Sequence, residues 1–178
     1  MRVVSGLCRG LRLNSLDGLD TRPTLDRVKE SLFSMLFDRC DGASGLDLFA
    51  GSGALGIEML SRYGKECTFV DLSPKAIEVI NSNIKKARME DKAKVKMADA
   101  LSFVNTTDCK YDIIFLDPPY ASGVYDEVLS VIKKRELLNA GGVVTLECPA
   151  DYKFETGGYT VLKDKKYGKV RLCVLELV

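Results

Sequence analysis

Hydrophobic positions along the chain fall into two kinds of segment, which alternate with each other. Short apolar runs, typical of buried strands, lie at 45–50, 67–70, 95–98, 111–116 and 142–147. Between these runs, hydrophobic residues recur every three or four positions, as they do on one face of an amphipathic helix. This alternation predicts βαβ units, and therefore a mainly parallel sheet with helices on both faces.

The predicted helices have recognisable ends. The first begins at 22–24, where a proline suits the first turn, and ends at Asp41-Gly42. The second follows the glycine-rich turn after residue 50. The third is capped by Ser73 with Pro74 at its first position, and the fourth spans 124–133. Antiparallel hairpins are predicted near both ends of the chain, pairing 2–4 with 11–13 and 160–163 with 170–178.

The length of 178 residues is enough for one domain with a substantial core, and too short for a nucleotide-binding domain plus a separate substrate domain. We expect a single domain over 1–178, in which a hairpin and helix at 1–40 precede a core at 41–178. No apolar run approaches the length that crosses a bilayer, so no membrane partner is expected. The 6 separated cysteines form no CxxC pair, which indicates free thiols and a cytoplasmic location.

Histidine is absent, which excludes Ser-His-Asp and Cys-His triads and HExxH metal sites, and we expect no metal. Since 26 basic residues face 25 acidic ones, the net charge is +1, and attraction to nucleic acid must be local. Basic stretches near the N-terminus and in the closing hairpin suit RNA phosphates. Their candidate contacts are Arg2, Arg9, Arg12, Lys166 and Lys169. A third basic stretch, 85–96, is diluted by acidic residues and favours a solvated face.

A nucleotide site is predicted where the first strand meets the second helix. Residues 51–56 match GxGxxG, whose glycines allow a tight turn and a close approach of ligand to backbone. Asp71 ends the next strand, where a carboxylate can accept from ribose hydroxyls. This pattern fits both NAD and S-adenosylmethionine (SAM). SAM is favoured because Asp47 suits an ammonium group, Asp99 suits the 6-amino group of adenine, and no second mononucleotide-binding half follows.

The most specific motif is Asp117-Pro118-Pro119-Tyr120, after an apolar strand. Its two prolines fix two φ angles and remove two N–H donors. The turn therefore presents acceptors only, the Asp117 carboxylate and the Pro118 carbonyl. Two acceptors at a fixed spacing can hold a planar amino group and draw its nitrogen lone pair out of conjugation, and Tyr120 can stack on the base.

Together with residues 47–53, this motif resembles class I SAM-dependent amino-methyltransferases. Nearly the whole chain resembles the RsmD family, which methylates the 2-amino group of a guanine, guanine 966, in bacterial 16S ribosomal RNA. The resemblance includes the opening residues 1–6, the segment Arg22-Pro23-Thr24 and the pair Tyr167-Gly168. It implies the Rossmann-like α/β methyltransferase fold, a seven-stranded, mainly parallel sheet with a reversed last strand.

The resemblance also implies SAM as cofactor and 16S rRNA as partner, within an assembled or assembling 30S subunit and with the protein as a monomer. Asp117, Pro118, Pro119 and Tyr120 would hold the target amine, and Arg22 would lie in a turn that closes over the cofactor or meets the RNA. The implied cofactor contacts are Asp47, Phe49, Gly51, Gly53, Asp71, Leu72, Asp99, Ala100 and Asp117.

Four other functions compete with this interpretation. An adenine-N6 methyltransferase acting on DNA or RNA more often has Asn where Asp117 stands. Carbon-5 methylation of a pyrimidine would use Cys148 as nucleophile and leave the acceptor turn idle. A nicotinamide-dependent reductase would need a substrate domain and a proton donor. A non-catalytic RNA-binding module that keeps SAM as a structural ligand would have no need of the acceptor turn.

Overall fold

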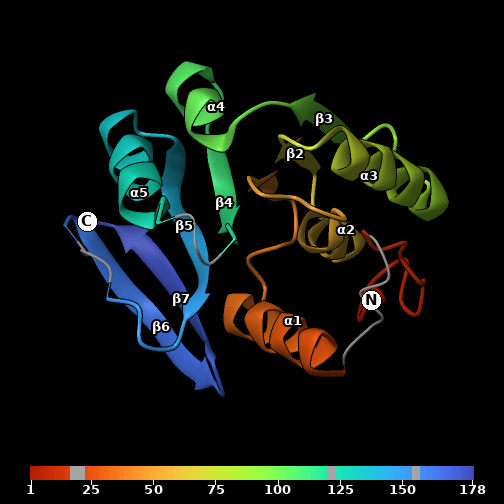
Figure 1. Cartoon of the computed structure of the whole chain (residues 1–178), viewed down its shortest axis with the longest axis horizontal. Helices are drawn as coiled ribbons and strands as arrows, with labels where there is room; N and C mark the ends of the chain where they lie inside the picture. Colours follow the sequence, from red (N-terminus) through yellow and green to blue (C-terminus); the bar gives the residue numbers. More distant parts are fainter. Residues whose placement is uncertain (17–22, 120–122, 154–156) are drawn as a thin grey trace.

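Strands and helices alternate along most of the chain, as the hydrophobic pattern predicts (Figure 1). The computed structural model describes residues 1–16, 23–119, 123–153 and 157–178. Its elements are α1 (Pro23–Leu36), β1 (Ser44–Asp47), α2 (Ala54–Ser61), β2 (Glu66–Asp71), α3 (Pro74–Ala87), β3 (Ala93–Met97), α4 (Ala100–Thr106), β4 (Tyr111–Leu116), α5 (Tyr125–Lys134), β5 (Leu138–Pro149), β6 (Tyr159–Tyr167) and β7 (Val170–Leu177).

The strands form one seven-stranded sheet in the order β3-β2-β1-β4-β5-β7-β6. Neighbouring strands from β3 across to β5 are parallel, whereas β7 runs antiparallel to both β5 and β6. This is the Rossmann-like methyltransferase sheet with a reversed last strand, so the predicted fold class is confirmed. The strand order reverses direction at β1 and β4, and ligands of such sheets bind outside the carboxyl ends of the strands there.

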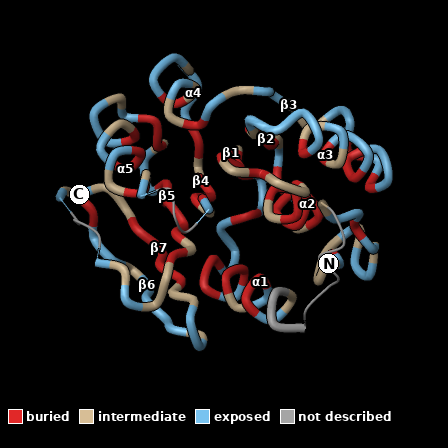
Figure 2. The backbone as a smooth tube through the Cα atoms, in the orientation of Figure 1, coloured by how far each residue is buried: buried red, intermediate tan, exposed pale blue. Residues whose placement is uncertain are grey.

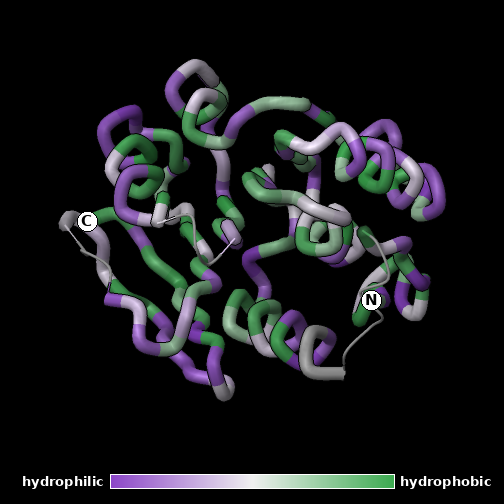
Figure 3. The backbone as a smooth tube through the Cα atoms, in the orientation of Figure 1, coloured by the Kyte–Doolittle hydropathy of each residue, from purple (hydrophilic) through white to green (hydrophobic). Residues whose placement is uncertain are grey.

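The helices cover both faces of the sheet. One cluster of buried side chains joins α1, α2 and α3 to one face, and a second joins α4 and α5 to the other. Buried positions lie in the strands and on the sheet-facing sides of the helices, and hydrophilic residues lie along the outer side of α3 (Figures 2 and 3). Among the helices of the described ranges, none is long and apolar enough to cross a membrane.

Local details differ from the sequence prediction at three places. Helix α1 ends at Leu36 and not at Gly42, because Phe37 takes a left-handed conformation with φ of 49°. The N-terminal hairpin is reduced to one isolated bridge, between Arg2 and Arg12. Helix α4 was not predicted, because its seven residues are too few to show a helical period. The Ser73 cap is confirmed, with its Oγ accepting from the Ala76 N–H.

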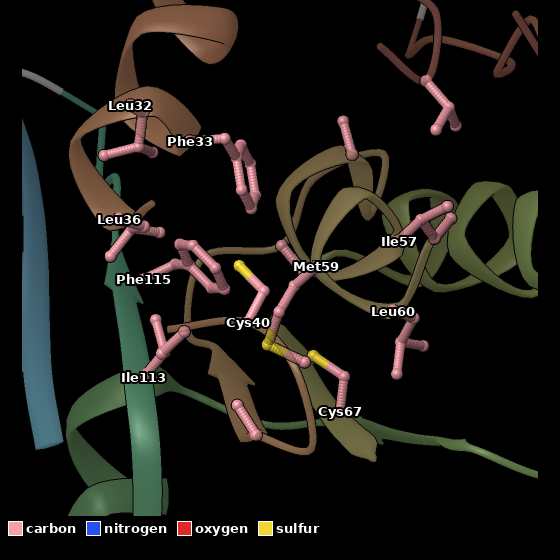
Figure 4. Close-up of a cluster of buried hydrophobic side chains, with 14 of the residues drawn as sticks. Leu32, Phe33, Leu36, Cys40, Ile57, Met59, Leu60, Cys67, Ile113 and Phe115 are labelled. Carbon is pink, nitrogen blue, oxygen red and sulfur yellow. The ribbon is translucent and has the colours of Figure 1, made fainter. Parts of the chain in front are cut away.

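Two glycines let α2 lie close against the sheet. A Cβ atom on Gly56 would lie 2.3 Å from Cε1 of Phe69, and one on Gly45 would lie 2.5 Å from Sδ of Met59. Figure 4 shows Met59 beside Cys67 in the cluster that α1 and β4 complete. The third glycine of the GxGxxG motif therefore serves helix–strand packing.

A buried carboxylate joins the N-terminal segment to α1 and α2. Both oxygens of Glu58, which is fully buried, accept hydrogen bonds: from the Val4 N–H at 2.7 Å and from the Ser5 N–H at 3.0 Å. The Lys29 Nζ and the Arg62 Nε also lie 3.0 Å from its oxygens. A charge buried this deeply is tolerated because every lone pair has a donor within reach.

We predict that Glu58→Gln lowers the free energy of unfolding by about 3–5 kcal/mol, the usual effect of removing one partner of a buried ion pair. The amide would leave the Lys29 charge unpaired and set an N–H donor against a backbone N–H. Urea denaturation measures the loss, and hydrogen exchange at Val4 and Ser5 should accelerate.

The matched control is Glu66→Gln, which breaks the exposed pair that Glu66 makes with Lys94. That change should lower the free energy of unfolding by less than about 1 kcal/mol. Equal losses for the two variants would contradict a special role for Glu58.

Candidate active site

Three carboxylates lie side by side at the carboxyl edge of the sheet. Asp47 ends β1, Asp117 follows β4, and Glu147 lies near the end of β5. Leu116 pairs with Leu146, so Asp117 and Glu147 follow neighbouring residues on adjacent strands. Side chains alternate along a strand, and the odd-numbered residues of β4 and β5 face α1 and α2. The three acids therefore point to the same face of the sheet.

Two adjoining cavities open at this edge. The larger, about 870 Å³, lies outside the ends of β1, β2, β3 and β4. The smaller, about 160 Å³, lies beneath α1 and contains Asp47, Asp117 and Glu147 in its wall. Phe49, Gly51 and Asp117 line both cavities. The other residues of the larger wall are Leu16, Leu48, Asp71, Leu72, Ser73, Ala98, Asp99, Ala100, Pro118, Pro119 and Val124.

Two carboxylates shape the glycine-rich loop from beneath. Gly51 and Gly53 have φ of 55° and 76°, which is the left-handed region that glycine enters without strain. One oxygen of Asp47 accepts from the Gly56 N–H at 2.9 Å, and one oxygen of Asp71 accepts from the Gly51 N–H at 2.8 Å. The loop is therefore held in place by the acids that were predicted to bind the ligand.

Asp71 and Asp99 also serve as structural caps. The second oxygen of Asp71 accepts from the Ser73 N–H at 2.9 Å, and Asp99 caps α4 by accepting from the Ser102 N–H at 2.8 Å. Both nevertheless lie in the wall of the larger cavity. Each carboxylate oxygen has more than one lone pair, so a ligand hydroxyl or amino group can still donate to them.

Burial and mutual repulsion raise the pKa values of the central acids. Burial raises the pKa of Asp47 from 3.8 to about 7, the Gly56 hydrogen bond opposes this, and the charge of Asp71 adds to it. Burial also holds the pKa of Asp117 well above its usual range, and the charges of Glu147 and Asp47 raise it further. Positive charge or N–H donors brought into this space would favour the ionised forms.

The walls fit SAM in both shape and chemistry. Apolar side chains of Leu48, Leu72 and Ala98 offer a surface for a flat adenine ring. Asp71 stands between the glycine loop and these apolar residues, where it can accept from a ribose. Asp47 supplies a carboxylate in the wall of the smaller cavity, next to the glycine loop, which suits an ammonium group.

The structure brings most of the predicted site residues together, but not all. Asp47, Phe49, Gly51, Asp71, Leu72, Asp99, Ala100, Asp117, Pro118 and Pro119 all line a cavity. Gly53 lies in neither cavity wall and begins α2 instead. Arg22 and Tyr120 lie outside the described residues.

The predicted RNA contacts that the structure describes fall into three groups. Lys166 and Lys169 are exposed at the turn between β6 and β7, where the Ala150 N–H donates to the Lys169 carbonyl at 2.9 Å. Tyr167 of the same turn hydrogen-bonds Ser31 of α1, the helix whose Val28 and Lys29 line the smaller cavity. The arm that carries Arg9 instead packs on Ser61, at the end of α2 farthest from the cavities.

Arg2 and Arg12 lie opposite each other in an isolated antiparallel bridge, whose hydrogen bonds run from Val3 N–H to the Leu11 carbonyl and from Leu13 N–H to the carbonyl of Met1, a residue that lines the smaller cavity. The Arg2 guanidinium also lies 3.8 Å from the Asp26 carboxylate, which offsets part of its charge.

Sequence reasoning missed two residues of the cavity wall, Lys29 and Glu147, and the buried Glu58 that supports that wall. Lys29 is buried on the apolar face of α1, in helical register with Leu32 and Phe33, and this mismatch was a usable signal. Glu58 is likewise the acidic residue inside an apolar helix. Glu147 ends an apolar run at the sheet edge that carries Asp117, and that position was a signal as well.

We predict that unfolding stability falls as pH rises from about 4 to about 7, because the folded chain keeps a proton on Asp47 that the unfolded chain releases. Asp47→Asn keeps an acceptor for the Gly56 N–H and removes this titration. The difference in unfolding free energy between pH 4 and pH 8 should shrink by roughly 2–4 kcal/mol in the variant. Urea denaturation across this range measures it, and an unchanged pH slope would contradict the buried proton.

Comparison with known proteins identifies relatives along the whole chain. The family model described as Conserved hypothetical protein 95 matches residues 1–176. The chain is 41% identical over 181 residues to YlbH of Bacillus subtilis, which covers 99% of this chain and 98% of that protein. It is 33% identical to ribosomal RNA small subunit methyltransferase D of Haemophilus influenzae, over 96% of this chain and 90% of that protein. It is 30% identical to the Escherichia coli protein of the same name, over 96% of this chain and 86% of that protein.

Solved structures show the same relationship. The structure of yhhF from Escherichia coli superposes with a TM-score of 0.88 at 28% identity, and covers 99% of this chain and 97% of that one. A methylase structure from Haemophilus influenzae superposes with a TM-score of 0.85 at 30% identity, and covers 99% of this chain and 98% of that one. The chain therefore belongs to the Conserved hypothetical protein 95 family, the RsmD family of class I methyltransferases, and it is a SAM-dependent methyltransferase.

Proposed function

We propose that this protein transfers a methyl group from SAM to the exocyclic 2-amino group of a guanine in 16S ribosomal RNA, guanine 966 by family resemblance. The observation that carries the proposal is the Asp117-Pro118 turn, an acceptor-only edge in the wall of the larger cavity, and its Asp117 also lines the smaller cavity. Relatives named as small-subunit rRNA methyltransferases support the class of substrate. We further propose that residues 1–178 act as one methyltransferase domain and as a monomer.

The proposed mechanism requires little acid–base chemistry. Bound SAM supplies an electrophilic methyl group. The Asp117 carboxylate and the Pro118 carbonyl accept hydrogen bonds from the amino group of the base, which orients the nitrogen lone pair for in-line attack. Holding two reactants in line can lower a barrier by about 7–11 kcal/mol. The methylated nitrogen then releases a proton, and the raised pKa of Asp117 makes that carboxylate a suitable acceptor.

The target guanine must leave its helix to reach this turn, or already be unpaired. The described part of the chain offers a small surface for selecting one base in a large RNA. We therefore propose an assembled or assembling 30S subunit as substrate, with ribosomal proteins helping to define the site.

Thiol chemistry is disfavoured by the position of Cys148. Its side chain is fully buried in the cluster that faces α4 and α5, on the other side of the sheet from Asp117. Burial raises the pKa of the Cys148 thiol to about 11, so little thiolate is present at neutral pH. Carbon-5 methylation, which needs a cysteine nucleophile, therefore has poor support.

The proposal is tested by methyl transfer from labelled SAM to small subunits from cells that lack the native modification, with naked 16S RNA and duplex DNA beside them. Nucleoside analysis should find the label in 2-methylguanosine. Label in methyladenine alone would replace this function with the adenine-N6 alternative. No label on any substrate, with SAM bound normally, would favour the RNA-binding module.

In the same assay we predict that Asp117→Ala lowers methyl transfer by at least about a hundredfold, because the amino group loses an oriented charged acceptor. Its SAM affinity, measured by calorimetry, should change by less than about threefold. Asp71→Ala is the matched variant and should instead weaken SAM binding. A large loss of SAM affinity in Asp117→Ala, with turnover preserved, would contradict the proposed role of Asp117.

We predict that Lys166→Glu with Lys169→Glu weakens binding to the subunit and flattens its salt dependence. Each lost phosphate contact should lower the slope of log K against log salt by roughly 0.7–0.9. The control is Lys85→Glu with Lys96→Glu, which reverses two exposed charges in the basic stretch that was predicted to be a solvated face. Filter binding at several salt concentrations measures the affinity of both double variants for the subunit. Equal slopes for the two would show that the β6–β7 hairpin does not contact the RNA.

A further inference from the structure

Three acids of the described residues line the smaller cavity, Asp47, Asp117 and Glu147. The sequence motifs and the proposed mechanism assign roles to Asp47 and Asp117, but none to Glu147. It is half-buried, it lies in the same wall as Asp117, and its charge raises the pKa of Asp117, so the two carboxylates are close. Strand register explains this proximity, because each residue directly follows one member of the Leu116–Leu146 pair.

This neighbourhood constrains how a base can approach. A base whose amino group meets Asp117 and the Pro118 carbonyl lies where the two cavities adjoin, and it presents its Watson–Crick edge to Asp117, beside which Glu147 lies. In guanine the ring nitrogen N1 is bonded to the carbon that carries the 2-amino group, and N1 bears a hydrogen. In adenine the equivalent neighbour of the 6-amino group is a bare N1 lone pair. An ionised carboxylate beside Asp117 would attract the first and repel the second.

We propose that Glu147 determines specificity for guanine by accepting a hydrogen bond from N1–H while Asp117 and Pro118 hold the 2-amino group. This inference rests on the proposed function and names the atom by which the same site selects its base. The strand ends bring the two acceptors together as neighbours, as the adjacent N1–H and 2-amino donors of guanine require. Rejection of adenine follows from leaving a carboxylate of the cavity wall opposite a lone pair.

The test compares guanine with 2-aminopurine, which keeps the 2-amino group and lacks the N1 hydrogen. Small subunits are reconstituted with 16S RNA that carries either base at the target position. For the wild-type enzyme, kcat/KM should be about tenfold to a hundredfold higher with guanine, as for one missing hydrogen bond to a charged group. Glu147→Gln offers both an N–H and a carbonyl, so it should reduce this preference at least about tenfold.

The control is Glu127→Gln, which removes one negative charge from the exposed side of α5 and should keep the wild-type preference. SAM affinity of Glu147→Gln should stay within about threefold of wild type, since the contact is to the base. A tenfold loss of SAM affinity with an unchanged base preference would assign Glu147 to the cofactor and overturn the inference.

Each remaining outcome also tests the inference, the proposed function, or both. If wild-type enzyme methylates guanine and 2-aminopurine equally well, N1–H is not recognised and the inference fails, even if Glu147→Gln does not fold. If guanine is methylated and Glu147→Gln keeps the full preference, the inference fails while the proposed function stands. If wild-type enzyme does not methylate guanine at all, the proposed function fails and the inference fails with it.

Discussion

The buried carboxylate of Glu58 is the interaction on which the wall of the smaller cavity depends. Its oxygens accept hydrogen bonds from the Val4 and Ser5 amides and form ion pairs with the Lys29 ammonium and the Arg62 guanidinium. Because a buried charge is unfavourable unless fully hydrogen-bonded, the N-terminal segment, α1 and α2 are held in one arrangement. That arrangement places Met1 and Lys29 over the ends of β1, β4 and β5, and so forms the cavity around Asp47, Asp117 and Glu147.

The acids beneath that wall are held at a cost to stability. Asp47 and Asp117 are buried beside like charges, and their raised pKa values show how unfavourable the ionised forms are without a ligand. Groups perturbed in this way gather where a protein binds and reacts. A cationic cofactor and a base that donates several N–H groups would both relieve the repulsion, so the same feature that weakens the fold favours its ligands.

The sheet order explains why these acids meet. Strands β1, β4 and β5 are adjacent and parallel, so their carboxyl ends lie at one edge, and the alternation of side chains turns all three acids toward α1 and α2. Cys148, one residue beyond Glu147, faces the opposite side for the same reason. A single step along β5 thus separates a buried thiol from a carboxylate in the cavity wall.

The sequence alone determined the features whose causes are local. The period of hydrophobic residues predicted a mainly parallel sheet with helices on both faces, whereas the seven strands and the reversed last strand were implied by the family resemblance. Gly51 predicted a tight loop, and Ser73 predicted its helix cap. It did not show α4, whose seven residues are too few for a period, or the early end of α1 at Phe37. Only the tertiary structure decided that Glu58 receives the N-terminal amides and that Glu147 lies beside Asp117. The physical reason is that a buried polar group is stabilised by whichever donors the fold brings to it, and here those donors lie 53 and 54 residues away along the chain.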